Sequence, residues 1–259
     1  MPEPQAGEKT LPDGALDVTL KDVHFSYEED REILKGIGLN LPAGSFVSLV
    51  GESGCGKSTI AGILAAKNRG YNGEIIIGGV PLNEVNETNL MQRVVLVRHN
   101  SYLFKGTVEE NLKMAKPDAT KEEMEAVLQK VNLLGFLQTQ LLEKASNLSG
   151  GQSQRLVIAR ALLRTDSAVY IFDEAASNID VESEELIMNV IHELAKTKTV
   201  LLISHRLANV VKSDKIYFLK DGEIKESGKH DELMSQNGAY RHLYESQMAL
   251  ENYGKGGMA

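Results

Sequence analysis

The sequence predicts an α/β fold, with a largely parallel sheet that carries helices on its faces and an inserted helical subdomain. Short apolar runs alternate with helical patterns along most of the chain, which is typical of parallel sheets. A glycine-rich turn joins one of these runs directly to a helix. In the middle of the chain, residues 107–163 show helical periodicity alone, which indicates the insertion.

The expected strands are short apolar runs bounded by polar or glycine residues. They lie at residues 45–50, 94–97, 168–172, 199–203 and 215–219. Residues 58–66 are expected to form the helix after the first strand. The helical subdomain is expected at about residues 100–164. Its pattern rests on apolar residues near helical spacing, with Glu and Lys between them: Met124, Val127, Leu128, Val131 and Leu134.

The two ends of the chain differ from the rest in composition. Residues 1–15 are polar and rich in Pro and Gly, which predicts a flexible linker. Residues 253–259 are expected to form a flexible tail. The folded domain would then span residues 16–252, a length that favours one domain with a subdomain.

Bulk composition excludes several classes of protein. The net charge of −8 argues against a nucleic-acid partner, because phosphate contacts need clustered Lys and Arg. The single cysteine, Cys55, excludes an intrachain disulfide and a cysteine-rich zinc site, and it fits a reducing cytosol. No apolar stretch approaches the roughly 20 residues of a membrane helix. A membrane role would therefore require a partner, or a membrane domain outside this chain.

The segment Gly51–Ser58 fits the pattern G-x-x-x-x-G-K-[ST] and lies between a predicted strand and a predicted helix. Its glycines let the backbone wrap around a phosphate chain, and the helix start favours an anion. Lys57 can act on the β- and γ-phosphates, and the Ser58 hydroxyl can bind Mg²⁺. The alternative is a chance glycine-rich turn. The predicted nucleotide-binding residues are Gly51, Ser53, Gly54, Cys55, Gly56, Lys57, Ser58 and Thr59, the last in a supporting role.

Two adjacent acids, Asp173 and Glu174, follow the apolar run 168–172. Successive side chains of an extended segment point to opposite sides, so the two carboxylates can have two functions. Asp173 would hold Mg²⁺ through its water shell, and Glu174 would orient or deprotonate an attacking water. The alternative is a helix cap or a solvated turn, and the phosphate loop favours the catalytic interpretation.

A second anion-binding helix start is predicted at Leu148–Gln152, which contains Ser149, Gly150, Gly151 and Gln152. Two such sites are unexpected in a chain that works alone. They make sense if two copies meet head to tail, each offering its serine and glycines to the γ-phosphate held by the other copy.

On these motifs the sequence resembles the ATP-binding cassette (ABC) family across nearly its whole length. Residues 51–58, 170–174 and 148–152 look like the family's Walker A, Walker B and signature motifs. Asp180, in the segment 177–180, resembles the D-loop at the dimer interface. His205 looks like the switch histidine that contacts the γ-phosphate, and Tyr27 like the aromatic that stacks on adenine. A lone His or Tyr is more often structural, but the shared order of motifs favours the family roles.

The resemblance implies a RecA-like P-loop NTPase core, an N-terminal antiparallel β subdomain and the inserted helical subdomain. It also implies that two such domains close over ATP and Mg²⁺, hydrolyse the ATP and reopen. The implied partners are a second nucleotide-binding domain and a transmembrane domain, fused or separate. The implied location is the cytoplasmic side of the cell membrane.

Within the family, several segments resemble exporters. Ala175 and Ala176 stand where importers tend to have a proline, and residues 103–111 and 204–207 look like exporter stretches. Three alternatives remain: an importer ATP-binding subunit, a soluble ATPase without a transport role, and a catalytically reduced partner in a heterodimer.

This sequence departs from the family at two places that the resemblance links to contact with a membrane partner. His99 stands where the family has the Q-loop glutamine, and a neutral imidazole can still bind a metal ion or a hydrogen-bond partner. The other interpretation of His99 is a tolerated substitution with weaker coupling. The interval 136–148 also looks several residues shorter than in exporters, although Glu143 resembles their acidic contact to the coupling helices.

Overall fold

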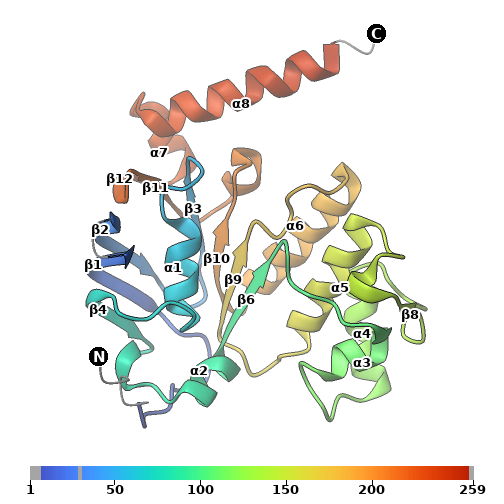
Figure 1. Ribbon diagram of the computed structural model, residues 1–259. Coiled ribbons are helices and arrows are strands. Elements are labelled where there is room, and N and C mark those ends of the chain that lie inside the picture. Colours follow the sequence, from blue (N-terminus) through green and yellow to red (C-terminus); the bar gives the residue numbers. More distant parts are fainter. Residues whose placement is uncertain (1–6, 29–30, 257–259) are drawn as a thin grey trace.

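The computed structural model describes residues 7–28 and 31–256. At its centre lies a six-stranded sheet in the order β12-β11-β3-β10-β9-β6 (Figure 1). All neighbouring pairs are parallel except β11 and β12 at one edge. The strands are β3 (Phe46–Gly51), β6 (Val94–Arg98), β9 (Val169–Asp173), β10 (Thr199–Ile203), β11 (Lys215–Lys220) and β12 (Glu223–Gly228). The predicted strands and the α/β class are therefore confirmed.

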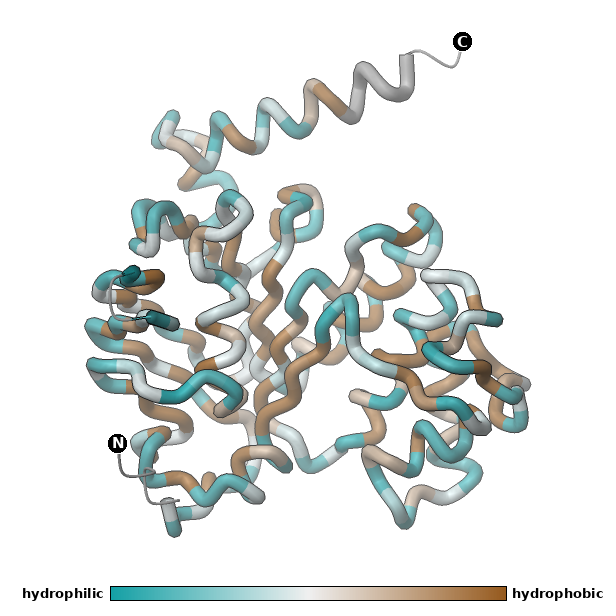
Figure 2. Tube along the Cα trace, in the orientation of Figure 1, coloured by the Kyte–Doolittle hydropathy of each residue, from teal (hydrophilic) through white to brown (hydrophobic). Residues whose placement is uncertain are grey.

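Alternating side chains of the central strands separate two hydrophobic cores. On β9, Val169 and Ile171 pack into one core, whereas Tyr170 and Phe172 pack into the other. This alternation follows from the two-residue period of a strand. Because both faces are covered, the strands are apolar along their length rather than alternating apolar and polar, as Figure 2 shows for the middle of the molecule.

One core lies between the central sheet, helix α1 (Lys57–Leu64) and a second, antiparallel sheet. This second sheet has the order β2-β1-β4-β5 and lies beside α1 in Figure 1. Its strands are β1 (Val18–Glu28), β2 (Arg31–Leu41), β4 (Asn72–Ile77) and β5 (Val80–Pro81). The expected antiparallel β subdomain near the N-terminus is thus present.

The other core includes the segment between β6 and β9, which contains three helices. Capping boxes begin all three, at Thr107, Thr120 and Ser149, each with a Glu or Gln three residues later. The elements are β7 (Gly106–Thr107), α3 (Val108–Lys113), α4 (Lys121–Lys130), β8 (Gln140–Leu141), the 3₁₀ turn η2 (Glu143–Ala145) and α5 (Gly150–Leu162).

The prediction of helical periodicity alone across residues 107–163 is wrong between α4 and α5. Helix α4 ends at Lys130, and Asn132 takes a left-handed conformation with φ +54°. Leu134, which matched the helical pattern, is 62% exposed. A short β pair and a 3₁₀ turn occupy the rest of this interval, so the apolar spacing of residues 131–134 reflects a turn rather than a continuing helix.

The remaining helices lie around the central sheet and at the chain's C-terminal end. They are η1 (Leu82–Glu84), α2 (Glu87–Arg93), α6 (Val181–Ala195), η3 (Leu207–Val210), α7 (His230–Ser235) and α8 (Ala239–Gly256). Helix α8 extends to Gly256, past the start of the tail predicted at 253–259. Residues 257–259 lie outside the described residues.

The predicted linker at 1–15 is wrong for residues 7–15, which pack against the domain; residues 1–6 lie outside the described residues. The backbone of Lys9 pairs with Glu84 and Asn86, and Leu11 is buried. The Arg93 guanidinium donates hydrogen bonds to the carbonyl oxygens of Pro12 and Gly14. The polar composition of this segment gave no sign that Leu11 is buried. Nor did it show that Arg93 binds the backbone carbonyls of the segment.

Candidate functional site

The predicted phosphate loop leaves β3 and enters α1 in a conformation that requires glycine at two positions. Gly51 has φ +147°, and a Cβ there would lie 2.0 Å from the carbonyl oxygen of Leu219. Gly56 has φ +113°, and its Cβ would lie 2.6 Å from a methyl group of Leu34. Gly56 precedes α1 and provides no side-chain cap, so the first amides of this helix remain available to an anion.

Lys57 lies inside this loop and is only 4% exposed. Its ammonium group donates hydrogen bonds to the carbonyl oxygens of Gly51, at 2.9 Å, and Glu52, at 2.7 Å. A phosphate oxygen in the loop would compete with these carbonyls for the same group. Cys55 lies 3.7 Å from the ammonium, and burial raises the pKa of its thiol. Cys55 therefore contributes backbone and packing rather than a thiolate.

A serine and a carboxylate meet where β9 ends beside α1. The Ser58 hydroxyl donates to Asp173 at 3.0 Å. Arg98, at the end of the neighbouring β6, places its Nε 3.4 Å from the other Asp173 oxygen. Burial raises the Asp173 pKa, while the Ser58 hydrogen bond and Arg98 oppose that shift. Adjacent hydroxyl and carboxylate oxygens are the hard ligands that Mg²⁺ prefers, so this pair fits that ion.

Glu174, the next residue, is directed to a different partner. It has φ +55°, a left-handed conformation that is uncommon outside glycine. Its carboxylate oxygen lies 2.6 Å from Nε2 of His205, which follows the end of β10. Because β10 lies next to β9 in the sheet, the ends of these two strands bring the predicted base and the predicted switch histidine together.

Tyr27 of β1 contacts the same helix from the antiparallel sheet. Its hydroxyl lies 3.1 Å from Oγ1 of Thr59 and accepts a hydrogen bond from Asn68 at 3.2 Å. The residue is 62% exposed, and Phe25 packs edge-on against its ring at 4.9 Å. Thr59 therefore supports Tyr27, and the exposed ring offers a flat surface near the phosphate loop.

The second predicted helix start, at Ser149–Gln152, packs against the D-loop segment instead. The Ser149 hydroxyl accepts from the Gln152 amide, and Asp180 caps α6 in the same way through Ser183. A Cβ on Gly151 would lie 2.3 Å from the Ser183 hydroxyl. Gly150 and Ser149 are exposed. In Figure 1, α5 and α1 lie on different sides of β9 and β6, so the structure does not bring these two sites together within one chain.

His99 follows β6 in an exposed turn. Its backbone amide donates to the carbonyl oxygen of Asp173 at 3.3 Å. The residue thus lies at the same strand ends as the Ser58–Asp173 pair, although its side chain contributes no hydrogen bond there among the described residues.

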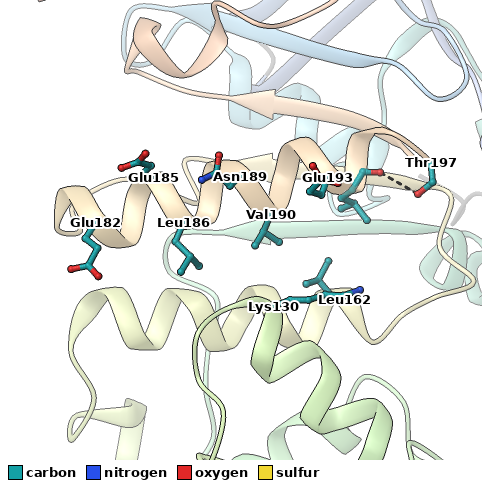
Figure 3. A pocket seen from close by; sticks show the side chains of 10 residues that line it. Lys130, Leu162, Glu182, Glu185, Leu186, Asn189, Val190, Glu193 and Thr197 are labelled. Atoms are coloured by element: carbon teal, nitrogen blue, oxygen red, sulfur yellow. Dashed lines mark hydrogen bonds between the residues drawn. The ribbon is translucent and has the colours of Figure 1, made fainter.

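Two cavities of the structure differ in how they lie relative to the predicted site residues. One of about 740 Å³ lies between α4, α5 and α6 and contains none of the predicted site residues (Figure 3). Its lining includes Leu186, Val190 and Glu193 of α6. Another, of about 330 Å³, opens on the phosphate loop at Glu52, Ser53, Gly54 and Cys55. The larger of these two cavities therefore lies away from the predicted site residues.

A family model described as ABC transporter matches residues 34–177, more than half of the chain. The chain belongs to the ABC transporter family. This ABC domain is an ATP-binding domain of the ATPase type, and the match includes the phosphate loop, the signature segment and the acid pair. Within the part of the chain that the structure describes, no helix has the length and apolar character needed to cross a membrane.

Relatives of the ABC domain include several transport proteins. It is 47% identical over 242 residues to an uncharacterized ABC transporter ATP-binding protein of Haemophilus influenzae, covering 91% of this chain and 43% of that protein. It is 38% identical to an ATP-dependent lipid A-core flippase of Vibrio vulnificus, covering 95% and 44%. It thus spans less than half the length of these relatives. A bacterial Atm1-family ABC exporter with ATP bound has a similar structure, with TM-score 0.87, 32% identity, and 94% and 43% coverage.

Two polar residues of the ABC domain's site were missed by sequence reasoning. Arg98 faces Asp173 because β6 and β9 are adjacent and in register, which the sequence does not reveal. Gln247 of α8 hydrogen-bonds to the backbone around His205, more than forty residues earlier in the chain. No local motif marks either residue.

Proposed function

We propose that this chain is the cytoplasmic nucleotide-binding domain of an ABC exporter, which binds and hydrolyses ATP to drive a membrane domain. The observation that carries the ATPase chemistry is the meeting of Ser58, Asp173, Glu174 and His205 at the ends of β9 and β10, directly beside the phosphate loop. A pair that would hold Mg²⁺ and a base–histidine pair therefore lie at neighbouring strand ends, as hydrolysis of a bound nucleotide would require.

Each residue has a distinct role in this proposal. Lys57 and the α1 amides bind the phosphates. Ser58 and Asp173 would hold Mg²⁺, which supplies positive charge to the phosphate oxygens when bound. Glu174 orients the attacking water and accepts its proton. His205 donates a hydrogen bond toward the γ-phosphate, and Tyr27 stacks on the adenine.

The complete site would need a second copy or a related domain. Ser149 and Gly150 are exposed at a helix start that lies away from the chain's own phosphate loop, so in a head-to-tail pair this helix start would act on an ATP held by the other chain. Asp180, beside Gly151, would lie at the same interface. The catalytically reduced alternative is disfavoured, because the lysine, both acids and the histidine are intact.

A groove between the core and the helical subdomain, which we propose spans about residues 100–164, would receive the membrane domain. A cavity of about 290 Å³ lies there between Val97, Phe104 and Met114. Phe104 is 47% and Met114 is 54% exposed, and nearby Tyr102 packs edge-on against Phe104 at 4.8 Å. Exposed apolar clusters of this kind mark protein interfaces. His99 and Glu143 would also contact the partner.

Export is favoured over import or a soluble role by the relatives. The names of these relatives, a lipid A-core flippase and an Atm1-family exporter, describe transport proteins. Both relatives are more than twice as long as the part that this chain matches. A membrane domain, fused or separate, would complete the transporter. The cytoplasmic side of the membrane is then the expected location, because ATP and the reducing environment are found there.

Glu174→Gln tests the catalytic assignment. The amide keeps the size of the side chain and its reach toward His205 but cannot accept the water's proton. We expect ATP binding to be retained and hydrolysis to fall by roughly 10²- to 10⁴-fold, the usual contribution of a general base. Nucleotide binding and phosphate release would be measured on the same preparation. Glu185→Gln, on the exposed face of α6, is the matched control, and normal turnover by Glu174→Gln would refute the assignment.

A further inference from the structure

The side chain of Gln247 binds two backbone groups of the loop that carries His205. Its Nε2 donates to the His205 carbonyl oxygen at 2.6 Å. Its Oε1 accepts from the Leu207 amide at 2.9 Å. A primary amide is well suited to this contact, because it presents a donor and an acceptor side by side. The loop after β10 is thereby attached to α8, a helix from the far end of the chain.

Helix α8 is itself firmly anchored near its start. The Glu226 carboxylate of β12 accepts from the backbone amides of Ala239, at 2.5 Å, and Tyr240, at 3.2 Å. Tyr240 is fully buried, and its hydroxyl lies 2.8 Å from Nδ1 of His230. Gln247 follows Tyr240 by seven residues, about two helical turns, so both side chains lie on the face that packs against the domain.

The opposite side of the same loop is held by α6. Glu184, a buried carboxylate, contacts the Arg206 guanidinium and accepts from the Asn209 amide at 2.8 Å. The Arg206 backbone amide also donates to the Ser204 hydroxyl at 3.0 Å. Contacts from α6 therefore fix the side chains that follow His205, whereas Gln247 fixes the His205 carbonyl itself.

We propose that Gln247 is a positioning residue for His205, through which α8 sets the place of the imidazole opposite Glu174. The proposal rests on the proposed function, in which His205 contacts the γ-phosphate. Gln247 holds His205 through the His205 carbonyl oxygen, and Nε2 of His205 lies 2.6 Å from the Glu174 carboxylate. Neither Gln247 nor α8 contacts the phosphate loop by any hydrogen bond of the described residues, so loss of the Gln247 contacts should lower hydrolysis far more than ATP binding.

The test replaces Gln247 with leucine, which has a similar size and neither hydrogen-bonding group. Gln247→Leu should lower kcat roughly 10- to 100-fold, the scale of a displacement near 1 Å at a catalytic group, with the KM for ATP unchanged within about twofold. Gln236→Leu, an exposed glutamine between α7 and α8, is the matched control and should keep both constants. The thermal unfolding midpoints of the two variants should agree within a few degrees.

A second arm separates positioning from a general structural effect. If Gln247 acts through His205, the double variant His205→Ala, Gln247→Leu hydrolyses ATP at the same rate as His205→Ala alone. An unchanged kcat in Gln247→Leu, a KM that rises in step with the loss of kcat, or a further loss in the double variant would each overturn the proposal. A wild-type rate in His205→Ala would instead refute the proposed function, so the two failures are distinguishable.

Discussion

Arg93 is expected to be a main attachment of the N-terminal segment to the domain. Its Nη2 donates to the carbonyl oxygens of Pro12, at 2.6 Å, and Gly14, at 3.0 Å, and Nη1 donates to that of Asp166. The residue is 8% exposed. Arg93→Met keeps the buried aliphatic part of the side chain and removes every donor, so it isolates the contribution of these hydrogen bonds.

The magnitude follows from two opposing effects. Hydrogen bonds to a charged donor stabilise by about 1.5 kcal/mol each, so losing three of them costs about 4–5 kcal/mol. The Arg93 Nε, however, is buried without a hydrogen-bond partner among the described residues. Removing it recovers a desolvation cost of about 1–3 kcal/mol. The free energy of unfolding should therefore fall by about 2–3 kcal/mol.

Thermal and denaturant unfolding of the chain would measure this change. For a domain of this size the melting temperature should fall by roughly 5–10 °C, at about 2–4 °C per kcal/mol. Arg69→Met is the matched control, because Arg69 forms an exposed ion pair with Glu87 at 2.8 Å and such pairs contribute less than about 1 kcal/mol. A loss in Arg93→Met no larger than that of the control would refute the attachment of residues 7–15 through this arginine.

Two further predictions concern the site. Asp173→Asn should abolish magnesium-dependent hydrolysis without lowering the stability of the nucleotide-free domain at neutral pH. Burial raises the pKa of Asp173, so the contribution of this carboxyl to stability is present below its unfolded pKa and is lost as the pH rises through the folded value. Denaturant unfolding of both proteins across pH measures this. A lower stability of Asp173→Asn than of the wild type at neutral pH would contradict the prediction. The composite site predicts that ATPase activity per wild-type molecule rises with protein concentration, and that Gly151→Ala, whose Cβ would overlap Ser183, removes this rise while keeping nucleotide binding. A concentration-independent rate from a confirmed monomer would contradict the composite site.

The elements that the sequence predicted best are those with an unbroken physical signal. Strands β9 and β10 are buried on both faces, so each is a short apolar run that few other structures produce. Leu134 shows the limit of the same reasoning. It matched a helical spacing, but the left-handed Asn132 had already ended α4, and nothing in the apolar pattern marks that backbone conformation.

In the candidate site too, residues of one contiguous motif were easier to predict than contacts between residues far apart in the sequence. The turn between β3 and α1 that carries Lys57 and Ser58 was predictable, because its motif is contiguous and its spacing follows from the geometry of a phosphate chain. The 2.6 Å contact between Glu174 and His205 depends on β10 lying beside β9, and strand order is a property of the whole sheet. Sequence analysis gave Glu174 a role at the attacking water and His205 a role at the γ-phosphate, but it predicted no contact between them.

Different elements hold the phosphate loop and the Glu174–His205 pair, so we expect that ATP binding and ATP hydrolysis can be altered separately. The phosphate loop is held by β3, by α1 and by the close approach of its glycines to Leu219 of β11 and Leu34 of β2. Glu174 keeps a left-handed backbone, which costs of order 1 kcal/mol and requires continuous support from its surroundings. The carbonyl of His205, its partner, is held by Gln247 of α8, and α6 holds the side chains of Arg206 and Asn209 in the same loop. A change that loosens α8 should therefore weaken the proposed hydrolytic pair while the phosphate loop keeps its shape. In that proposal the C-terminal helix would affect the rate of hydrolysis more than the affinity for ATP.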